Sequence, residues 1–209
     1  MTRQHKVAAI VLAAGRSTRM GAANKLLAEL GGTAVVRRVA EAALASQARP
    51  VLVVTGHQAE AVRSALAGLD VTFVANPDFA QGLSTSLKAG LRALSGEADG
   101  ALILLGDMPR IAAGDLDRLI ALFAAEGGEA IIAPLHEGKR GNPVVWPRAY
   151  FAEMLELEGD TGAGRLLAAH AANVRGIDLG TDAIHADVDT PEALAELRSL
   201  SPLAGRGSG

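Results

Sequence analysis

The sequence predicts an α/β protein in which helices cover both faces of a mainly parallel sheet, arranged as one three-layer domain. The first observation is a set of short apolar runs without charge, typical of strands buried on both faces; Val7–Ala14 is the first of them. The second is that segments with helical spacing lie between these runs, which implies strand–helix–strand units. The third is that polar or glycine-rich loops follow the runs. Because ligands of such sheets bind beyond the carboxyl ends of the strands, we expect function in these loops.

The first half of the chain alternates strands and helices in a regular order. Thr33 is expected to cap a helix over Ala34–Ala48, whose apolar residues recur at helical spacing. Further strands are expected at Val51–Thr55, Val71–Ala75 and Ala101–Leu105, with helices over His57–Leu66 and Leu83–Leu94 between them.

The second half is less regular. We expect helices over Asp115–Glu126, Ala149–Leu157 and Arg165–Ala172, strands over Glu129–Pro134 and Ile184–Val188, and a loop from Gly141 that enters a short strand ending at Trp146. Thr190-Pro191-Glu192 predicts the start of a last helix, because threonine can cap it, proline suits the first helical position and an acid suits the first turn. Residues 201–209 are rich in Ser, Gly and Pro, so we expect a disordered tail after a domain spanning residues 1–200.

Composition excludes several classes of protein. The 209 residues, 49% of them hydrophobic, suit one globular domain with a full core. A net charge of −3 argues against a general nucleic-acid binder. The chain has no cysteine, which excludes disulfides, thiolate nucleophiles and cysteine-ligated metals. With no recognisable signal peptide and no apolar run near the ~20 residues of a membrane helix, we expect no membrane contact and a cytoplasmic location.

A cationic loop with two glycines follows the first strand. The loop and the residues after it include Gly15, Arg16, Ser17, Thr18, Arg19, Gly21 and Lys25. Glycines let backbone N–H groups approach anionic oxygens, and the cations can neutralise charge that the amides cannot. The spacing fits neither the P-loop nor the dinucleotide fingerprint G-x-G-x-x-G. The simpler alternative is a strand-to-helix turn with surface cations, but the crowding of glycines and cations favours a polyphosphate site.

Asp107 follows another buried strand and should lie at the same edge of the sheet. A carboxylate beside a polyphosphate requires a cation between them, and Mg²⁺ is commonly held by one or two carboxylates together with substrate phosphates. The alternative is a turn aspartate before Pro109. Asp187 and Asp189 offer a second carboxylate; alternation in the expected strand places both on one side, and Asp189 is nearer the strand end. Asp189 could equally be an acid that flanks the last helix.

The run from Leu12 to Gly21, followed by Lys25 (LAAGRSTRMG…K), resembles the signature of nucleotidyltransferases that make nucleoside-diphosphate conjugates. It most resembles the molybdenum cofactor nucleotidyltransferases of the molybdopterin cytidylyltransferase type. The resemblance implies a Rossmann-like α/β domain of the nucleotide-diphospho-sugar transferase type. It also implies Arg19, Lys25 and Asp107 as catalytic residues, with Asp107 and Asp189 as ligands of Mg²⁺.

The resemblance extends to the substrate sites. It assigns the nucleotide to Ala13, Ala14, Gly15, Arg19, Lys25, Asn76, Gly82 and Ser86, and the acceptor to Gly141, Asn142, Pro143 and Asp160. The loop after the expected strand Val71–Ala75 has a simpler alternative. Part of it is explained without function if Asn76-Pro77 forms a turn and Ser84 caps a helix. In the second glycine-rich loop, residues 159–164, Gly164 stands where the family has arginine, and Arg165 follows it. This departure from the family's pattern concerns the acceptor site and not the reaction.

The function implied is Mg²⁺-dependent transfer of CMP from CTP to molybdopterin or the molybdenum cofactor, with release of pyrophosphate. A molybdoenzyme or its chaperone would be a protein partner. We expect CTP rather than GTP as the donor. Residues 12–15 read LAAG where the guanylyl enzymes resemble LAGG, so Ala14 stands at the position of a glycine. Alternatives are a GTP-dependent or a sugar- or polyol-phosphate nucleotidyltransferase, a nicotinamide-dependent oxidoreductase, and a non-catalytic cofactor-binding chaperone. The missing G-x-G-x-x-G argues against the oxidoreductase, and the presence of Lys25 and Asp107 argues against the chaperone.

Overall fold

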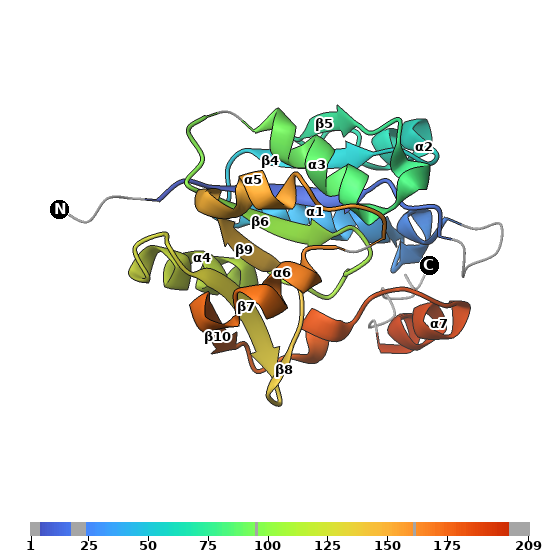
Figure 1. Ribbon diagram of the computed structural model, residues 1–209. Helices are drawn as coiled ribbons and strands as arrows, with labels where there is room; N and C mark the ends of the chain where they lie inside the picture. Colours follow the sequence, from blue (N-terminus) through green and yellow to red (C-terminus); the bar gives the residue numbers. More distant parts are fainter. Residues whose placement is uncertain (1–4, 18–23, 95, 161, 201–209) are drawn as a thin grey trace, which may run out of the picture.

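The computed structural model describes residues 5–17, 24–94, 96–160 and 162–200 (Figure 1). The strands are β1 (Val7–Ala13), β2 (Glu29–Leu30), β3 (Thr33–Ala34), β4 (Val51–Thr55), β5 (Thr72–Ala75), β6 (Gly100–Leu105), β7 (Ile131–His136), β8 (Lys139–Arg140), β9 (Val144–Pro147) and β10 (Val174–Asp178). The α-helices are α1 (Val35–Ala45), α2 (Ala59–Ala65), α3 (Leu83–Ala93), α4 (Ala113–Ala125), α5 (Phe151–Met154), α6 (Gly164–Ala169) and α7 (Pro191–Leu200). Short 3₁₀ turns include η2 (Lys25–Leu27), η3 (Phe79–Gln81), η4 (Arg148–Tyr150), η5 (Ala171–Asn173) and η6 (Asp182–His185).

The main sheet has eight strands in the order β10-β7-β9-β6-β1-β4-β5, with β8 beside β7. The pairs of β1 with β4 and β6, of β4 with β5, and of β10 with β7 are parallel, whereas β9 runs antiparallel to both β6 and β7. The expected mainly parallel sheet is therefore confirmed. Because β1, β4, β5 and β6 run in one direction, their carboxyl ends share one edge of the sheet, on the right in Figure 1.

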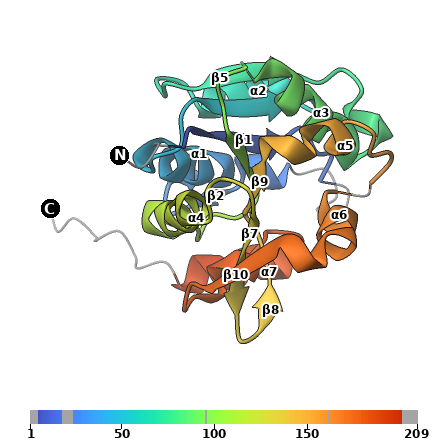
Figure 2. The ribbon, with the colours of Figure 1, turned by 60° about the vertical axis from the view of Figure 1, so that its left-hand side comes forward.

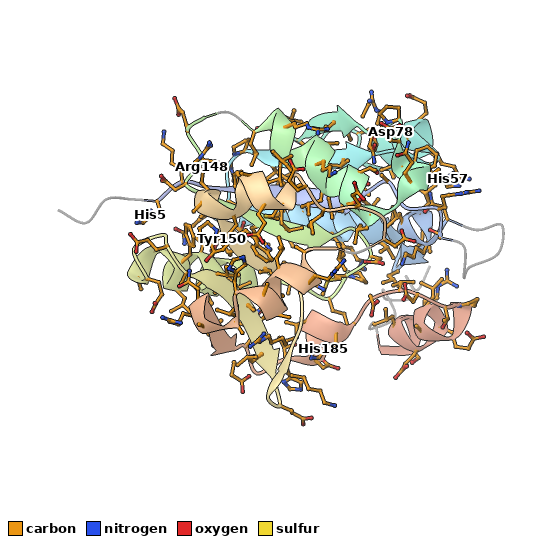
Figure 3. The ribbon with its side chains drawn as sticks, viewed as in Figure 1. His5, His57, Asp78, Arg148, Tyr150 and His185 are labelled. Atoms are coloured by element: carbon orange, nitrogen blue, oxygen red, sulfur yellow. The ribbon has the colours of Figure 1, made fainter. Side chains whose placement is uncertain are left out.

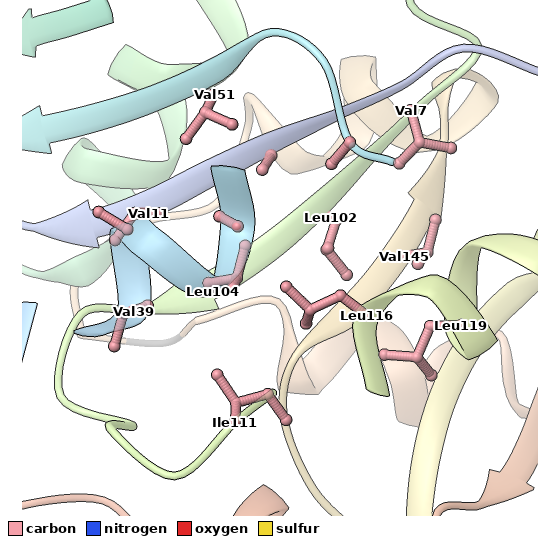
Figure 4. Close-up of a cluster of buried hydrophobic side chains, with 14 of the residues drawn as sticks. Val7, Val11, Val39, Val51, Leu102, Leu104, Ile111, Leu116, Leu119 and Val145 are labelled. Atoms are coloured by element: carbon pink, nitrogen blue, oxygen red, sulfur yellow. The ribbon is translucent and has the colours of Figure 1, made fainter. Parts of the chain in front are cut away.

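Alternation along β1 separates two apolar cores. Val7, Ala9, Val11 and Ala13 belong to a core with residues of α1, α2 and α4, part of which is shown in Figure 4. Ile10, Leu12 and Ala14 belong to the other core, with residues of α3, α5 and α6. Figure 2 shows α1 and α4 on one side of the sheet and α3, α5 and α6 on the other. Helices thus cover both faces in three layers, and β1 lies at the centre of the buried region.

Two local expectations were wrong, and one strand was missed. Ile184–Val188 was expected as a strand, but Asp182–His185 forms η6 and an irregular segment follows. The edge strand is instead β10, which was not expected. Its Arg175, Gly176 and Asp178 are exposed, so the segment lacks the apolar pattern of a buried strand. Thr33 does not cap α1, because it pairs in the β2–β3 hairpin and the helix begins at Val35.

The remaining boundaries agree more closely. The expected helix over Ala149–Leu157 is a 3₁₀ turn followed by the short α5. The start of α7 is confirmed, since the backbone N–H of Ala193 donates to Oγ1 of Thr190 at 3.2 Å. The expected tail, residues 201–209, lies outside the described residues. Among the helices of the described chain, none is long and apolar enough to cross a membrane.

Candidate active site

A cleft of about 570 Å³ opens at the carboxyl ends of β1 and β6, and we call it the first cleft. Its lining comes from the segment after β1, from η2, from the start of α3, and from Asp107, Asp160, Asp187 and Asp189. A second cleft of about 450 Å³ lies beside it, with β9 and the start of α6 in its lining. Leu12, Leu83 and Leu105 line both, so an apolar ridge separates two adjoining clefts.

Lys25 holds two aspartates together at the base of the first cleft. Its Nζ contacts Oδ2 of Asp107 directly and lies 2.6 Å from Oδ1 of Asp189. The side chains of Lys25 and Asp107 are 17% and 11% exposed, so this ion pair is largely removed from water. Burial lowers the pKa of the Lys25 ammonium, but the facing Asp107 and Asp189 carboxylates outweigh burial and raise that pKa above its ordinary value. Lys25 is therefore a permanent cation in this site.

The backbone brings Asp187 and Asp189 to Asp107. The N–H of Val188 donates to the carbonyl of Asp107 at 2.9 Å, which fixes the segment before α7 beside the end of β6. Val188 is fully buried against Leu30, Val35 and Leu194, so the aspartates on either side of it remain near the cleft. The hydrogen bond and the burial of Val188, rather than a strand ladder, thus position both carboxylates.

The three aspartates form a group with the chemistry of a divalent metal site. One carboxylate oxygen from each of Asp107, Asp187 and Asp189 lies within 4.8 Å of the others. Asp107 is buried, and within the described chain its Oδ1 has no hydrogen-bond partner. Partial burial raises the pKa of Asp187, and the nearby Asp189 and Asp107 carboxylates raise it further. A bare buried oxygen among mutually repelling carboxylates fits a hard cation such as Mg²⁺ or Mn²⁺, whose preferred ligands are oxygens.

A hydrogen-bond network fixes the backbone around Lys25. Oδ1 of Asn24 accepts from the N–H of Leu26 at 3.0 Å and from Oγ of Ser17 at 3.3 Å. Nδ2 of Asn24 donates to Oε1 of Gln58 at 3.1 Å, and the N–H of Lys25 donates to Oγ of Ser17 at 3.2 Å. Asn24 and Gln58 were not predicted as functional, although an asparagine directly before the lysine was a readable N-cap signal. Arg19, predicted as catalytic, lies outside the described residues.

Four of the predicted nucleotide residues, Ala14, Gly15, Gly82 and Ser86, line the first cleft beside Lys25. Ala13 is fully buried behind this lining. Asn76 is also buried and does not line either cleft. Its Nδ2 donates to Oγ1 of Thr85 and Oγ of Ser86, and its Oδ1 accepts from the N–H of Asp78 at 3.0 Å. Asn76 therefore ties the loop after β5 to the start of α3 and acts behind the lining.

The predicted acceptor residues divide between the two clefts. Gly141 and Asn142 line the second cleft, Asp160 lines the first, and Pro143 is buried beside the second. The N–H of Asn142 donates to the carbonyl of Ile184 at 3.1 Å, and a Cβ at Gly141 would lie 2.5 Å from that oxygen. Gly141 is thus required for close packing.

The second cleft combines an apolar lining with cations. Trp146, Leu87, Ile103 and Leu167 supply the apolar lining, and Arg140 and Arg165 supply the charge. Gly164, which stands in the family's arginine position, and Arg165 after it both line this cleft. The one-residue displacement therefore leaves an arginine in the lining.

The histidines do not assemble into a site within the described chain. Figure 3 shows His5 at the start of β1, His57 at the opposite end of the sheet and His185 near η6. His170 lies 2.7 Å from Glu153 and packs edge-on against Tyr150. None of the histidines belongs to the aspartate group or to the lining of the two clefts.

Comparison with known proteins identifies relatives along most of the chain. A molybdenum cofactor cytidylyltransferase of Escherichia coli K12 is 29% identical over 186 residues, covering 88% of this chain and 91% of the relative. Bifunctional protein GlmU of Kineococcus radiotolerans is 40% identical over 136 residues, which cover 63% of this chain. That match spans 28% of the length of GlmU.

Solved structures and a family model agree with these relatives. Rv0371c of Mycobacterium tuberculosis H37Rv has a TM-score of 0.81 and 29% identity, covering 94% of this chain and 99% of Rv0371c. Rv0371c has also been solved in complex with manganese, with a TM-score of 0.78, 28% identity and coverage of 93% and 99%. The family model of the MobA-like NTP transferase domain matches residues 9–174. This chain therefore belongs to the MobA-like NTP transferase family and is a nucleotidyltransferase.

Proposed function

We propose that this chain transfers CMP from CTP to the phosphate of molybdopterin or the molybdenum cofactor and releases pyrophosphate. The observation that carries the proposal is the contact of Lys25 with Asp107 and Asp189 at the base of the first cleft. This contact brings a cation together with carboxylate oxygens of the kind that a divalent metal binds, and nucleotidyl transfer from a triphosphate uses both. The E. coli relative, matched over 91% of its length, supports the choice of reaction.

The first cleft suits a nucleoside triphosphate. Its volume of about 570 Å³ is within the usual range for a small-molecule site. Gly15, Ser17 and Lys25 line this cleft. Gly15 and Ser17 are proposed to meet phosphate oxygens, and Lys25 to neutralise the charge that develops on the α-phosphate and the leaving group. Arg19 is proposed to hold the distal phosphates.

Asp107 and Asp189 are proposed to hold Mg²⁺, with Asp187 as a further neighbour. When bound, the ion would neutralise phosphate charge and draw the triphosphate and the acceptor phosphate together. The manganese complex of Rv0371c supports a divalent ion in this family. In the transfer, an oxygen of the acceptor phosphate attacks the α-phosphorus, the bond from the α-phosphorus to the α,β-bridging oxygen breaks, and pyrophosphate leaves. Chemistry of this kind needs positioning and charge neutralisation rather than a covalent nucleophile.

The second cleft is proposed to hold the acceptor. Its apolar lining, which includes Trp146, suits a flat heterocycle such as a pterin better than a sugar, and Arg140 and Arg165 suit its phosphate. Because the clefts share the ridge of Leu12, Leu83 and Leu105, an acceptor there would adjoin a nucleotide in the first cleft.

The donor base is proposed to pack near Ala14. A Cβ built on Gly56 would lie 2.9 Å from Cβ of Ala14 and 2.7 Å from Cβ of Phe79, so the wall here is tightly packed. A methyl group on such a wall crowds a purine more than a pyrimidine. CTP is therefore the proposed donor.

Pyrophosphate release tests the proposal. The assay uses each of CTP, GTP, ATP and UTP with Mg²⁺, with molybdopterin or with a sugar 1-phosphate as acceptor. We expect release that requires molybdopterin and is fastest with CTP. Release with the sugar phosphate but not with molybdopterin would assign the chain to the sugar-phosphate class instead.

A further inference from the structure

Lys25 engages the same carboxylates that the proposed metal requires. Its ammonium contacts Oδ2 of Asp107 and lies 2.6 Å from Oδ1 of Asp189, two of the three members of the aspartate group. Asp107 retains only its buried Oδ1 without a partner in the described chain. In this arrangement the ammonium already serves as the counter-ion of the group.

A divalent ion and the ammonium cannot both be well bound in this arrangement. Carboxylate oxygens of the group lie within 4.8 Å of one another, so an ion that binds them would lie next to Nζ of Lys25. Like charges at such a distance repel strongly where water is partly excluded. The ammonium must therefore leave before the ion can bind tightly.

The local structure allows the side chain alone to leave. The backbone at Lys25 is held by its N–H bond to Ser17 and by the cap from Asn24 to the N–H of Leu26. Beyond this fixed backbone, four methylene groups and a compact ammonium can turn to a new partner. Gly15 and Ser17, proposed above to meet the phosphates, line the same cleft as Lys25, so the phosphates would offer that partner.

We propose that Lys25 keeps the metal ligands occupied while the cleft is empty and releases them when a triphosphate binds. This regulation rests on the nucleotidyl-transfer function proposed above. The triphosphate draws the ammonium from Asp107 and Asp189, and the freed carboxylates bind the divalent ion. Metal and triphosphate therefore bind with strong positive coupling, and the protein alone binds the metal weakly.

Mn²⁺ titration, followed by loss of the free-ion paramagnetic resonance signal, tests the coupling without measuring turnover. Without nucleotide, we expect Lys25→Met to bind Mn²⁺ about 10- to 100-fold more tightly than the natural protein, because the competing charge is gone. Lys25→Arg keeps the charge and should stay weak. Lys6→Met is the matched control, since Lys6 pairs with Glu97 before the start of β1 and not near the cleft. If Lys25→Met does not fold, Lys25→Gln replaces it.

A non-hydrolysable CTP analogue supplies the second arm. It should tighten Mn²⁺ binding of the natural protein by more than tenfold, and that of Lys25→Met by much less. Equal Mn²⁺ affinity of the natural protein and Lys25→Met without nucleotide would overturn the coupling and leave the metal site intact. Failure of every protein to bind Mn²⁺, even with the analogue, would overturn the proposed metal-dependent function as well.

Discussion

Gly82, at the start of α3, packs directly on the backbone of Gly159. A Cβ at Gly82 would lie 2.5 Å from the carbonyl carbon and oxygen of Gly159, and the N–H of Ser84 donates to that oxygen at 3.2 Å. Gly82 lines the first cleft. Residues 162–164, in the loop that begins at Gly159, line the second cleft. This glycine pair therefore joins the lining of the first cleft to a segment that reaches the second.

Gly82→Ala should destabilise the protein. Gly82 has a φ of 115°, which is unfavourable for alanine, and the added methyl would displace residues 159 and 160. We expect the free energy of unfolding to fall by about 1–3 kcal/mol, measured by denaturant titration. Gly15→Ala is the matched control, because Gly15 lines the same cleft but, within the described residues, no heavy atom lies within 4 Å of a Cβ built on it. Equal losses in the two variants would contradict the close packing of Gly82 on Gly159.

Asn24→Ala should misplace Lys25. The substitution removes the cap on the N–H of Leu26 and the bond to Gln58, and each lost cap typically costs about 1 kcal/mol. We expect kcat to fall more than tenfold, because the ammonium must be held precisely enough to meet developing charge. Asn24→Asp keeps the accepting oxygen and should recover part of kcat. A kcat of Asn24→Ala equal to that of the natural protein would show that the network does not position Lys25.

The sheet could be predicted from the sequence because its central strands are apolar throughout. Val7–Ala13 and Gly100–Leu105 are almost fully buried, and their uniformly apolar composition indicates burial on both faces. The exposed edge strand β10 has no such pattern and was missed. Residues 184–188 were misassigned because Ile184 and Val188 are buried, as strand residues would be. Their backbones instead bond to Asn142 and Asp107, and the segment forms no strand.

The site could be predicted only in part. Lys25, Asp107 and Asp189 were each singled out, but their mutual contact joins residues far apart in the sequence, which no local pattern encodes. Asn76 was expected to contact the nucleobase, because the side-chain amide of an asparagine after a strand can hydrogen-bond to the edge of a base. Its three side-chain hydrogen bonds to the protein instead place it behind the cleft lining.

Asp107→Asn should preserve the fold and remove the metal. The Asp107 backbone carbonyl still accepts from Val188, whereas the bare carboxylate oxygen loses its charge. We expect a folded protein with a lower melting temperature, because the largely buried ion pair with Lys25 is weakened, and a loss of Mg²⁺-dependent nucleotide binding in calorimetry. Asp160→Asn, in the same cleft but outside the aspartate group, should retain that binding. Undiminished Mg²⁺–nucleotide binding in Asp107→Asn would move the metal to Asp187 and Asp189 alone.

Ala14→Gly should relax the preference for CTP over GTP. Removing the methyl group opens space beside the tightly packed Phe79 and Gly56, and steric differences of this size are worth about 1–3 kcal/mol. The measurement is kcat/KM for both triphosphates. Ala13→Gly is the matched control, because Ala13 is fully buried and does not line either cleft; it should cost stability without changing the ratio. A donor ratio that is unmoved in Ala14→Gly would make Ala14 a core residue only.

The most direct test of nucleotidyl transfer is to follow the two ends of labelled CTP in one reaction with molybdopterin. With label on the α-phosphate, we predict that it appears in a molybdopterin–CMP conjugate, and that label on the γ-phosphate appears in pyrophosphate. The transfer should be lost in Asp107→Asn. Label from the γ-phosphate in the acceptor, or label from the α-phosphate found only in free CMP or CDP, would contradict the account.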